Sequence, residues 1–369
     1  TSGYATISYM AAGSYSVFWV DDRNRNRRWD PPREKAQPFQ NLEYNLSQEE
    51  VDTVGTVYLH QPDTTAPRLQ AVGVYSSSRL RVRFSEDALL KLDQPLEVTD
   101  SLGNPYSEAY PLYRSQSRNN IWFVHLENAL QNASYQLKVD TVQDRIGNIT
   151  SGETENFSGS ADEDTTLQRI IEADREPELF PHDSLAITYA DIISEPEIVD
   201  SLYVIRQREK VQWEKREIVR NRLIIHPDSV WSTQTDYTIL IWDPKKQDFR
   251  SLSPTIYGPD DTGEIALIFN PGNDSLTEPR NLKVTLVNLQ QNRRIERNWQ
   301  ITAPQTDTLR YSQLKPEEYR IRVYEDISGD GTWNPGTVVP FQPPEPLFIR
   351  PKIPVRAGMA SELPISFGR

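Results

Sequence analysis

Residues 319–336 read Y-R-I-R-V-Y-E-D-I-S-G-D-G-T-W-N-P-G, an alternating pattern followed by a polar loop that ends near a tryptophan. Residues 15–31 read Y-S-V-F-W-V-D-D-R-N-R-N-R-R-W-D-P, so the alternating pattern, the loop length and the tryptophan all recur. Apolar side chains at every second position indicate half-buried strands. Because internal repetition is typical of modular proteins, the chain is predicted to contain repeated β-modules.

The composition narrows the fold class and the range of partners. A length of 369 residues favours roughly two to four domains, each able to bury its own core. Only 37% of residues are hydrophobic while 10% are aromatic and 27 are proline, which suits short two-faced strands joined by turns. We therefore predict an all-β chain of tandem β-sandwiches joined by short linkers.

The charge and the cysteine count exclude several classes of function. The net charge of −13 disfavours long-range attraction of the whole molecule to nucleic acid or anionic lipid, although a local basic patch remains open. The chain has no cysteine, so disulfides, thiol catalysis and thiolate metal sites are excluded. No apolar run is long enough to span a bilayer, and no leader pattern follows Thr1.

Turn signals divide the chain into four predicted modules: residues 1–61, 62–160, 161–254 and 255–369. The first module begins on the late strands of the repeat, because the early strands are recognisable only in the last module, near residues 281–289. We therefore expect the natural protein to extend further, with any leader or lipid anchor upstream of Thr1. Strands are also expected at residues 6–9, and at the alternating positions Val54, Val57 and Leu59.

Two further segments carry local signals. A short helix is expected near residues 165–175, with Asp164 as its cap and Leu167, Ile170 and Ile171 on one face. Residues 210–220 are highly charged and fit either a long hairpin arm or a helical turn.

The second module closely resembles a bacterial Ig-like domain of the S-layer type found in surface lipoproteins of the Bacteroidota. The resemblance lies in D-T-T-A-P-R-L at 63–69, L-R-V-R-F-S-E at 80–86 and A-S-Y-Q-L-K-V-D-T-V-Q-D-R-I-G-N at 133–148. The third module resembles the same domain more loosely, through I-I-H-P at 224–227 and T-D-Y-T-I at 235–239.

The first and last modules resemble the prealbumin-like or carboxypeptidase-regulatory-like β-sandwich that follows Ig-like domains in such lipoproteins. The most specific piece is L-K-P-E-E-Y-R-I-R-V-Y-E-D-I-S-G-D-G-T-W-N-P-G at 314–336. Together the resemblances imply a string of β-sandwiches at the outer membrane or cell surface. They imply no catalytic residues.

The polar loop of the last module has the spacing of a calcium loop. Ca²⁺ favours several oxygen ligands that converge within a short turn. The candidate ligands are Asp326, Ser328, Asp330, the carbonyl of Thr332, and Asn334. The alternative is that these side chains cap their own backbone while the tryptophan packs on the sandwich.

The equivalent loop of the first module is rich in arginine, with Arg23, Arg25, Arg27 and Arg28 between its polar residues. Their charge would oppose a bound cation. This stretch is either an anion-binding or partner-docking patch, or a solvated loop.

A three-residue pattern of Asp, then Ser or Thr, then an aliphatic residue or Thr recurs ten times. It resembles the O-glycosylation acceptor motif of exported Bacteroidota proteins, and the alternative is that such pairs simply begin strands after turns. The candidate acceptors are Thr53, Thr64, Ser101, Thr141, Thr165, Ser184, Ser201, Ser229, Ser275 and Thr308.

Catalytic motifs are missing from the sequence. There is no G-x-S-x-G, H-E-x-x-H or phosphate loop, and the four histidines lack metal-ligand spacing. Tryptophans could form a platform for sugars, but their dispersion over several strands favours packing in the cores. These residues are Trp122, Trp213, Trp231, Trp242 and Trp299.

The sequence thus predicts a non-catalytic extracytoplasmic scaffold or accessory subunit that docks to other envelope proteins at the bacterial outer membrane or cell surface. The alternative is a glycan-binding or adhesive surface module. No cofactor is expected beyond the candidate calcium ion, and no nucleic acid. Membrane association is expected only through an anchor upstream of Thr1.

Overall fold

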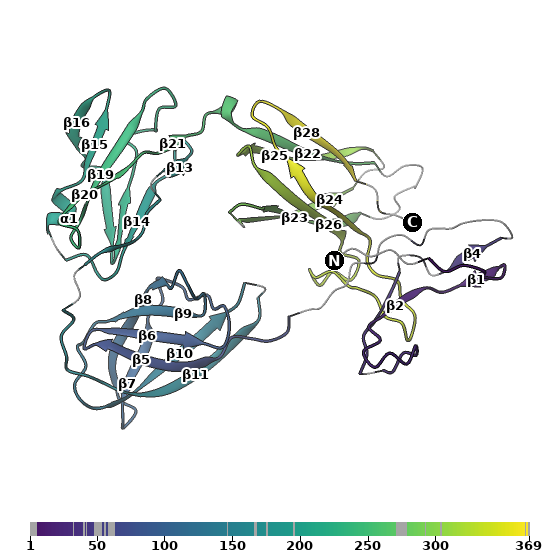
Figure 1. The fold of residues 1–369 in the computed structure, drawn as a ribbon, viewed down its shortest axis with the longest axis horizontal. Coiled ribbons are helices and arrows are strands. Elements are labelled where there is room, and N and C mark those ends of the chain that lie inside the picture. The colour runs from purple at the N-terminus through teal and green to yellow at the C-terminus, as the bar shows by residue number, and fades with distance from the viewer. Residues whose placement is uncertain are drawn as a thin grey trace. The chain divides into compact units, whose positions relative to one another are not determined.

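The structure is a computed structural model that describes residues 6–31, 33–39, 41, 43–47, 54, 57, 63–145, 147–165, 168–174, 176–194, 196–270, 279–291, 293–302, 305–365 and 367. The chain is all-β (Figure 1), and its described helices are the short α1 (Pro196–Asp200) and the 3-10 helix η1 (Pro259–Asp261). It divides into two compact units, Pro62–Gly258 and a unit formed by Thr1–Gln61 with Pro259–Arg369.

The first central domain (63–165) is one seven-stranded sheet that curls around its own core. Its order is β11-β10-β7-β8-β9-β6-β5, and the edge strands β5 and β11 approach each other, where the Leu69 amide donates to Glu153. The strands are β5 (Leu69–Ser76), β6 (Arg79–Phe84), β7 (Leu96–Asp100), β8 (Pro105–Arg114), β9 (Ile121–Leu126), β10 (Ser134–Gln143) and β11 (Ile149–Ser158). In β6, alternate residues Leu80, Val82 and Phe84 are fully buried, as the period of a half-buried strand requires.

The second central domain (168–258) has two four-stranded sheets around a separate core. One sheet, in the order β12-β14-β18-β17, contains β12 (Ile170–Glu172), β14 (Leu185–Tyr189), β17 (Arg216–Val219) and β18 (Arg222–Ile225). The other, in the order β16-β15-β19-β20, contains β15 (Tyr203–Arg206), β16 (Glu209–Gln212), β19 (Tyr237–Asp243) and β20 (Asp248–Leu252). A short parallel pair joins β13 (Glu178–Leu179) to β21 (Thr255–Ile256).

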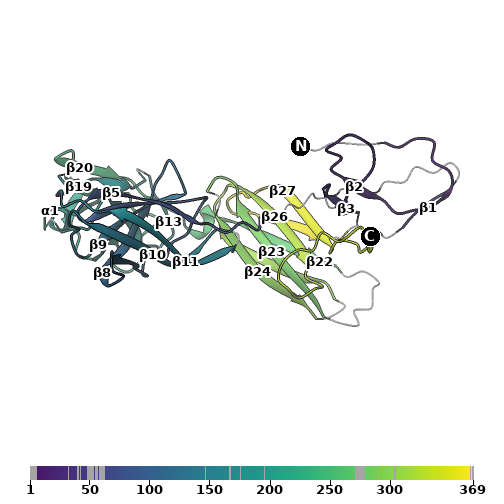
Figure 2. The ribbon, with the colours of Figure 1, turned by 90° about the horizontal axis from the view of Figure 1, so that it is seen from below.

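The C-terminal sandwich (259–367) packs a three-stranded sheet and a four-stranded sheet around a third core. The first, β25-β22-β28, contains β22 (Gly263–Phe269), β25 (Asp307–Leu314) and β28 (Ala360–Ile365). The second sheet has the order β24-β23-β26-β27, and its strands lie side by side in Figure 2. They are β23 (Arg280–Asn288), β24 (Arg294–Ile301), β26 (Glu318–Glu325) and β27 (Leu347–Pro354).

The N-terminal segment (6–57) contains two hairpin-like pairs. Strand β1 (Gly13–Tyr15) pairs with β4 (Tyr44–Leu46), and β2 (Phe18–Val20) pairs with β3 (Ala36–Pro38). The β2–β3 pair sets Val20 opposite Ala36, and the β26–β27 pair sets Tyr324 opposite Leu347 at the equivalent place. The sequence repeat therefore corresponds to a repeated strand–loop–strand unit.

Several local predictions are wrong. In place of the helix expected near 165–175, Ile170–Glu172 form strand β12, because the β-branched pair Ile170 and Ile171 fits a strand that hydrogen-bonds to β14. Residues 166, 167 and 175 lie outside the described part of the chain. The charged segment 210–220 is neither a single hairpin arm nor a helical turn, since it crosses from β16 in one sheet to β17 in the other.

In the N-terminal segment, residues 6–9 are exposed and form no strand, and neither Val54 nor Val57 lies in a strand. Leu59 is outside the described residues. Alternation at these positions was not enough, because a strand also needs a hydrogen-bonded neighbour.

Candidate functional site

The two tryptophan loops share one design. We call residues 22–34 the N-terminal tryptophan loop and residues 326–345 the C-terminal tryptophan loop. In the first, the indole nitrogen of Trp29 donates to the carbonyl of Glu34 at 3.0 Å, and in the second Trp333 donates to the carbonyl of Glu345 at 2.8 Å. Trp333 is buried against the sandwich, as expected from a tryptophan at this position.

A buried glutamate organises each loop. Glu345 Oε1 accepts hydrogen bonds from the amides of Ile327 and Ser328, both at 2.9 Å, and Oε2 accepts one from the amide of Asn334 at 2.9 Å. The side chain of Glu34 makes the same three kinds of contact, with the amides of Arg23, Asn24 and Asp30. Sequence reasoning missed both glutamates, because the segment between the tryptophan and the glutamate is much longer in the C-terminal loop.

Three of the five candidate calcium ligands of the C-terminal tryptophan loop, Asp326, Asp330 and Asn334, accept hydrogen bonds from the loop's own donors. Asp326 accepts from the amides of Gly329 and Gly331, at 2.9 and 3.1 Å, and the Lys283 ammonium nitrogen lies 3.8 Å from its carboxylate. A cation beside this carboxylate disfavours a second cation there.

Asp330 and Asn334 behave in the same way as Asp326. Asp330 accepts from the amide and the hydroxyl of Thr332, and these hydrogen bonds, the amide first, hold the pKa of Asp330 below its usual range. Asn334 accepts from the amide of Gly336 at 2.9 Å. This geometry matches the self-capping alternative, while calcium binding by this loop stays a prediction.

A group of carboxylates that sequence reasoning missed lies in the first central domain. Oxygens of Asp63, Glu86 and Asp144 lie within 4.8 Å of one another. Burial first, and then the charges of Asp63, Asp144 and Asp87, raise the pKa of Glu86. Asp144 also accepts from the amides of Gly147 and Asn148, at 2.7 and 2.9 Å.

The signal for this group was present in the sequence. Asp63, Glu86 and Asp144 stand in the three stretches that carry the Ig-like resemblance, and the curled sheet brings these stretches together at one end. Carboxylate oxygens suit a hard cation. Exposed acidic groups are also common without one, so the group by itself defines no metal site.

Most of the candidate glycosylation acceptors are accessible. The exposed ones are Thr64, Ser101, Thr141, Thr165, Ser184, Ser229 and Thr308. Ser201 is half-buried, and Thr53 and Ser275 lie outside the described residues. The hydroxyl of Ser184 lies 2.8 Å from Nδ1 of His226.

The tryptophans do not form a sugar platform. Trp213 and Trp231 are stacked, with ring centroids 5.7 Å apart and an interplanar angle of 11°, but they are only 4% and 1% exposed. Trp122 and Trp299 are also buried, and Trp242 is half-buried. The prediction that these rings pack in the cores is confirmed.

A buried polar junction connects the two central domains. Arg79 of β6, 4% exposed, forms an ion pair with Asp164 of the linker at 2.6 Å. Its guanidinium also donates to the carbonyl of Ala190 in the second central domain at 3.2 Å, and it lies over the ring of Tyr75. One side chain thus contacts both domains and the linker between them.

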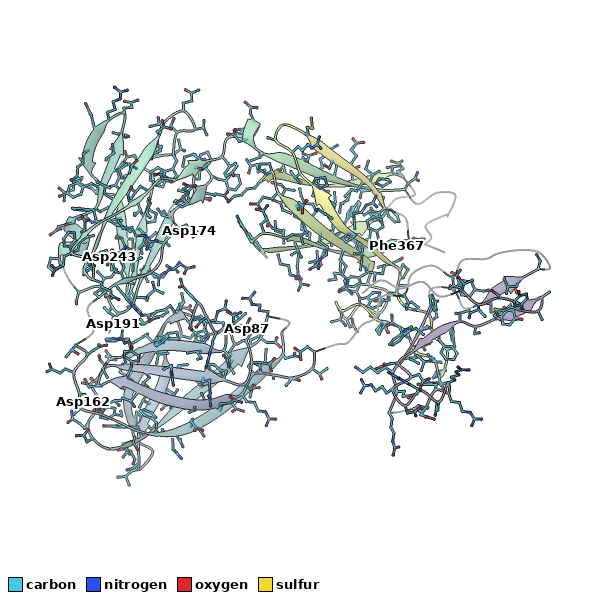
Figure 3. All side chains as sticks on the ribbon, in the orientation of Figure 1. Asp87, Asp162, Asp174, Asp191, Asp243 and Phe367 are labelled. Atoms are coloured by element: carbon cyan, nitrogen blue, oxygen red, sulfur yellow. The ribbon has the colours of Figure 1, made fainter. Side chains whose placement is uncertain are left out.

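A second contact of this junction joins His125 of β9 to Asp191, with Nδ1 and Oδ1 2.8 Å apart. Asp191 is labelled in Figure 3. Burial would raise the pKa of Asp191, but hydrogen bonds from His125 and the Ile192 amide, with the charges of His125 and Arg79, hold it below its usual range.

Side chains of the second domain also reach carbonyl groups of the first. Asn221, 2% exposed, lies 3.5 Å from the Leu112 carbonyl, and Arg220 donates to the Leu92 carbonyl. In the other direction, Gln116 donates to the carbonyl of Ile171 at 2.8 Å. Sequence reasoning missed this junction, since its partners are far apart along the chain.

Comparisons with known proteins give only a distant likeness. No family model and no curated protein matches the chain. Among solved structures, it is similar to the N-terminal part of the bacterial S-layer protein SbsC, with 12% identity over 53% of this chain and 45% of that chain, at a TM-score of 0.23. It is similar to domains 1–6 of the surface layer protein SbsC, with 10% identity over 80% of this chain and 41% of that chain, at a TM-score of 0.25.

The domains FN1–FN3 of chicken CNTN1 are also similar, with 10% identity over 79% of this chain and 97% of that chain, at a TM-score of 0.16. The chain spans less than half of the length of the two S-layer structures. In the described part of the chain, no helix is long and apolar enough to cross a membrane.

Proposed function

We propose that the chain is a non-catalytic extracytoplasmic scaffold or accessory subunit that docks to partner proteins at the bacterial outer membrane or cell surface. The observation that carries the proposal is the junction around Arg79. Burying an arginine is costly unless it is paired, so its contacts with Asp164 and Ala190 favour one fixed arrangement of the two domains. A fixed pair of domains suits a scaffold that presents surfaces at set positions.

The alternative of a glycan-binding module is less well supported. Sugar recognition by stacking needs exposed rings, whereas the stacked pair Trp213 and Trp231 lies in a core. The half-buried rings of Tyr203 and Trp242 and the exposed ring of Phe249 meet edge to face, so they offer no flat platform.

The scaffold proposal is tested by affinity isolation from native membranes, with the tagged full chain as bait. We expect a small, reproducible set of envelope proteins, and loss of these proteins with an Arg79→Met variant that unpairs the junction. Arg118→Met, at an exposed site of the same domain, is the matched control. If the wild-type chain and a heat-unfolded sample retain the same proteins, the docking proposal fails.

We also propose that the exposed acceptors carry O-linked glycans. The support is that seven of the eight described acceptors are exposed, from Thr64 to Thr308. The intact mass of the protein isolated from its native source is expected to exceed the polypeptide mass, with glycopeptides at these sites. An intact mass equal to that of the bare polypeptide rejects the modification and leaves the docking proposal untouched.

A further inference from the structure

The N-terminal tryptophan loop carries five exposed arginines, four between Asp22 and Trp29 and a fifth at Arg33, on a chain whose net charge is −13. Arg23 pairs with Asp21 at 2.9 Å. Among the described residues, the side chains of Arg25, Arg27 and Arg28 make no hydrogen bond or ion pair. These three guanidinium groups are therefore available to an external anion.

Two of these arginines occupy strained backbone positions. Arg25 and Arg27 have φ values of 60° and 61°, in the left-handed region that disfavours residues with a Cβ. At the equivalent positions of the C-terminal tryptophan loop, Gly329 and Gly331 have φ values of 74° and 79°. The same backbone shape is thus made with glycine in one copy and with arginine in the other. Positive φ alone does not mark function, since Arg208 also has it, but the arginine–glycine difference between the two copies points to a role for these arginine side chains.

The acidic groups of the loop accept hydrogen bonds from the loop's own amides, while its arginines are exposed. The carboxylate of Asp22 accepts from the amides of Asn26 and Arg27, at 3.1 and 2.8 Å. Asp30 accepts from the side-chain amides of Asn24 and Asn26, both at 2.7 Å. The acidic groups are half-buried or buried, while all five arginines are exposed.

This arrangement suits an array of anions better than a single small one. Asp22 and Asp30 already accept hydrogen bonds within the loop, while the guanidinium groups are exposed to solvent. Each can bind a different phosphate in a bidentate way, which is the geometry that guanidinium favours. Salt at physiological concentration screens charges over about 8–10 Å. Acidic residues farther from the loop than this distance therefore do not cancel the attraction of its arginines for an anion.

Exposed apolar side chains in the same segment favour a membrane as the source of these anions. Phe18 leads into the loop, is 39% exposed and lies with its ring 6.2 Å from Trp29. Ile7, Tyr9 and Met10 are also exposed. Arginine beside exposed aromatic and aliphatic groups suits the boundary between headgroups and acyl chains. We infer that the N-terminal tryptophan loop docks on the anionic phospholipid headgroups of a membrane surface, independently of any lipid anchor.

The test is co-sedimentation of the full chain with vesicles of phosphatidylcholine, with and without about 30% phosphatidylglycerol. We expect binding only to the anionic vesicles and its loss as salt rises from about 0.05 to 0.5 M. The variant Arg25→Gly/Arg27→Gly is expected to bind about 25-fold more weakly, at about fivefold per arginine. Because this variant copies the glycines of the other loop, its melting temperature is expected to equal or exceed that of the wild type.

The matched control is Arg118→Gln/Arg208→Gly, which makes the same change in net charge at two exposed positions and includes an arginine at a φ of 70°. The control is expected to bind like the wild type. If the glycine variant melts early, Arg28→Gln, at an ordinary φ, gives a fivefold loss as a second readout. Three results would overturn the inference. The test and control variants could lose binding equally, or Arg25→Gly/Arg27→Gly and Arg28→Gln could both bind like the wild type. The third result is retention of the chain by dextran sulfate but not by anionic vesicles.

Discussion

Replacing Glu345 by alanine should destabilise the C-terminal sandwich and open its tryptophan loop. The carboxylate is 6% exposed and accepts hydrogen bonds from three loop amides, those of Ile327, Ser328 and Asn334. The substitution leaves these three donors without their partner. It tests whether the loop is held by its own side chains or needs a bound cation.

The magnitude follows from the kind of bond that is lost. A hydrogen bond to a charged group contributes about 1.5–3 kcal/mol, but three bonds to one carboxylate are not additive, and water can reach part of the opened loop. We expect Glu345→Ala to lower the free energy of unfolding by about 3 kcal/mol and the melting temperature by roughly 10 °C. Glu345→Gln keeps Oε1 for two amides but places an N–H donor against the Asn334 amide, so about 1–2 kcal/mol is lost.

The assay combines scanning calorimetry of the full chain with hydrogen exchange of peptides covering residues 326–334. The matched control is Glu318→Ala, because Glu318 forms a largely exposed ion pair with Lys352 at 2.7 Å and should contribute below about 0.5 kcal/mol. The wild type and the Glu345→Ala variant are each measured with Ca²⁺ and with a chelator. A self-capped loop gives the same wild-type melting temperature in both, whereas a calcium loop melts earlier with chelator.

Two results would refute the reasoning. One is a melting temperature for Glu345→Ala no lower than that of Glu318→Ala. The other is loop exchange in Glu345→Ala that matches the wild type, which would show that the carboxylate does not hold the loop amides.

Three further changes test other parts of the structure. The Tyr311 hydroxyl is buried with no hydrogen-bond partner among the described residues, and burial raises its pKa to about 12, so Tyr311→Phe should stabilise the C-terminal sandwich by about 0.5–1 kcal/mol in calorimetry. The pKa of Glu86 is raised in the folded state, so its ionised form lowers stability at pH values above its ordinary pKa of 4.5. Glu86→Gln should therefore raise the melting temperature at pH 7 and lose this advantage near pH 4. The pKa of Asp191 is lowered, so its contribution to stability is present above the ordinary value of 3.8 and is lost as the pH falls through the lower folded pKa. As the pH falls below 3.8, X-ray scattering should therefore show the wild type approaching the larger radius of gyration expected of Asp191→Asn.

The sequence by itself determined the class of fold and the repeat. Alternation at Leu80, Val82 and Phe84 needs no tertiary information, because side chains of a strand point to opposite faces whatever the sheet contains. Likewise, a polar loop that ends near tryptophan predicts a capped hairpin, and the structure places Trp333 against its sandwich.

Short segments were predicted less well. The spacing of Ile170 and Ile171 fits a helix face and a strand equally, and the decision came from hydrogen bonds to β14. The charged segment 210–220 carries no signal that it changes sheets between β16 and β17, because that crossing is a property of the whole domain.

Only the tertiary structure decided which polar residues act together. Glu345 reaches the amides of residues 327, 328 and 334 across a loop of unequal length in the two copies, and Arg79 meets Asp164 and Ala190 across a domain boundary. The alternation of buried and exposed residues within a strand follows from backbone geometry, so it can be read from neighbouring residues. Contacts between distant residues depend on how the sheets curl and pack, and no spacing along the chain records that.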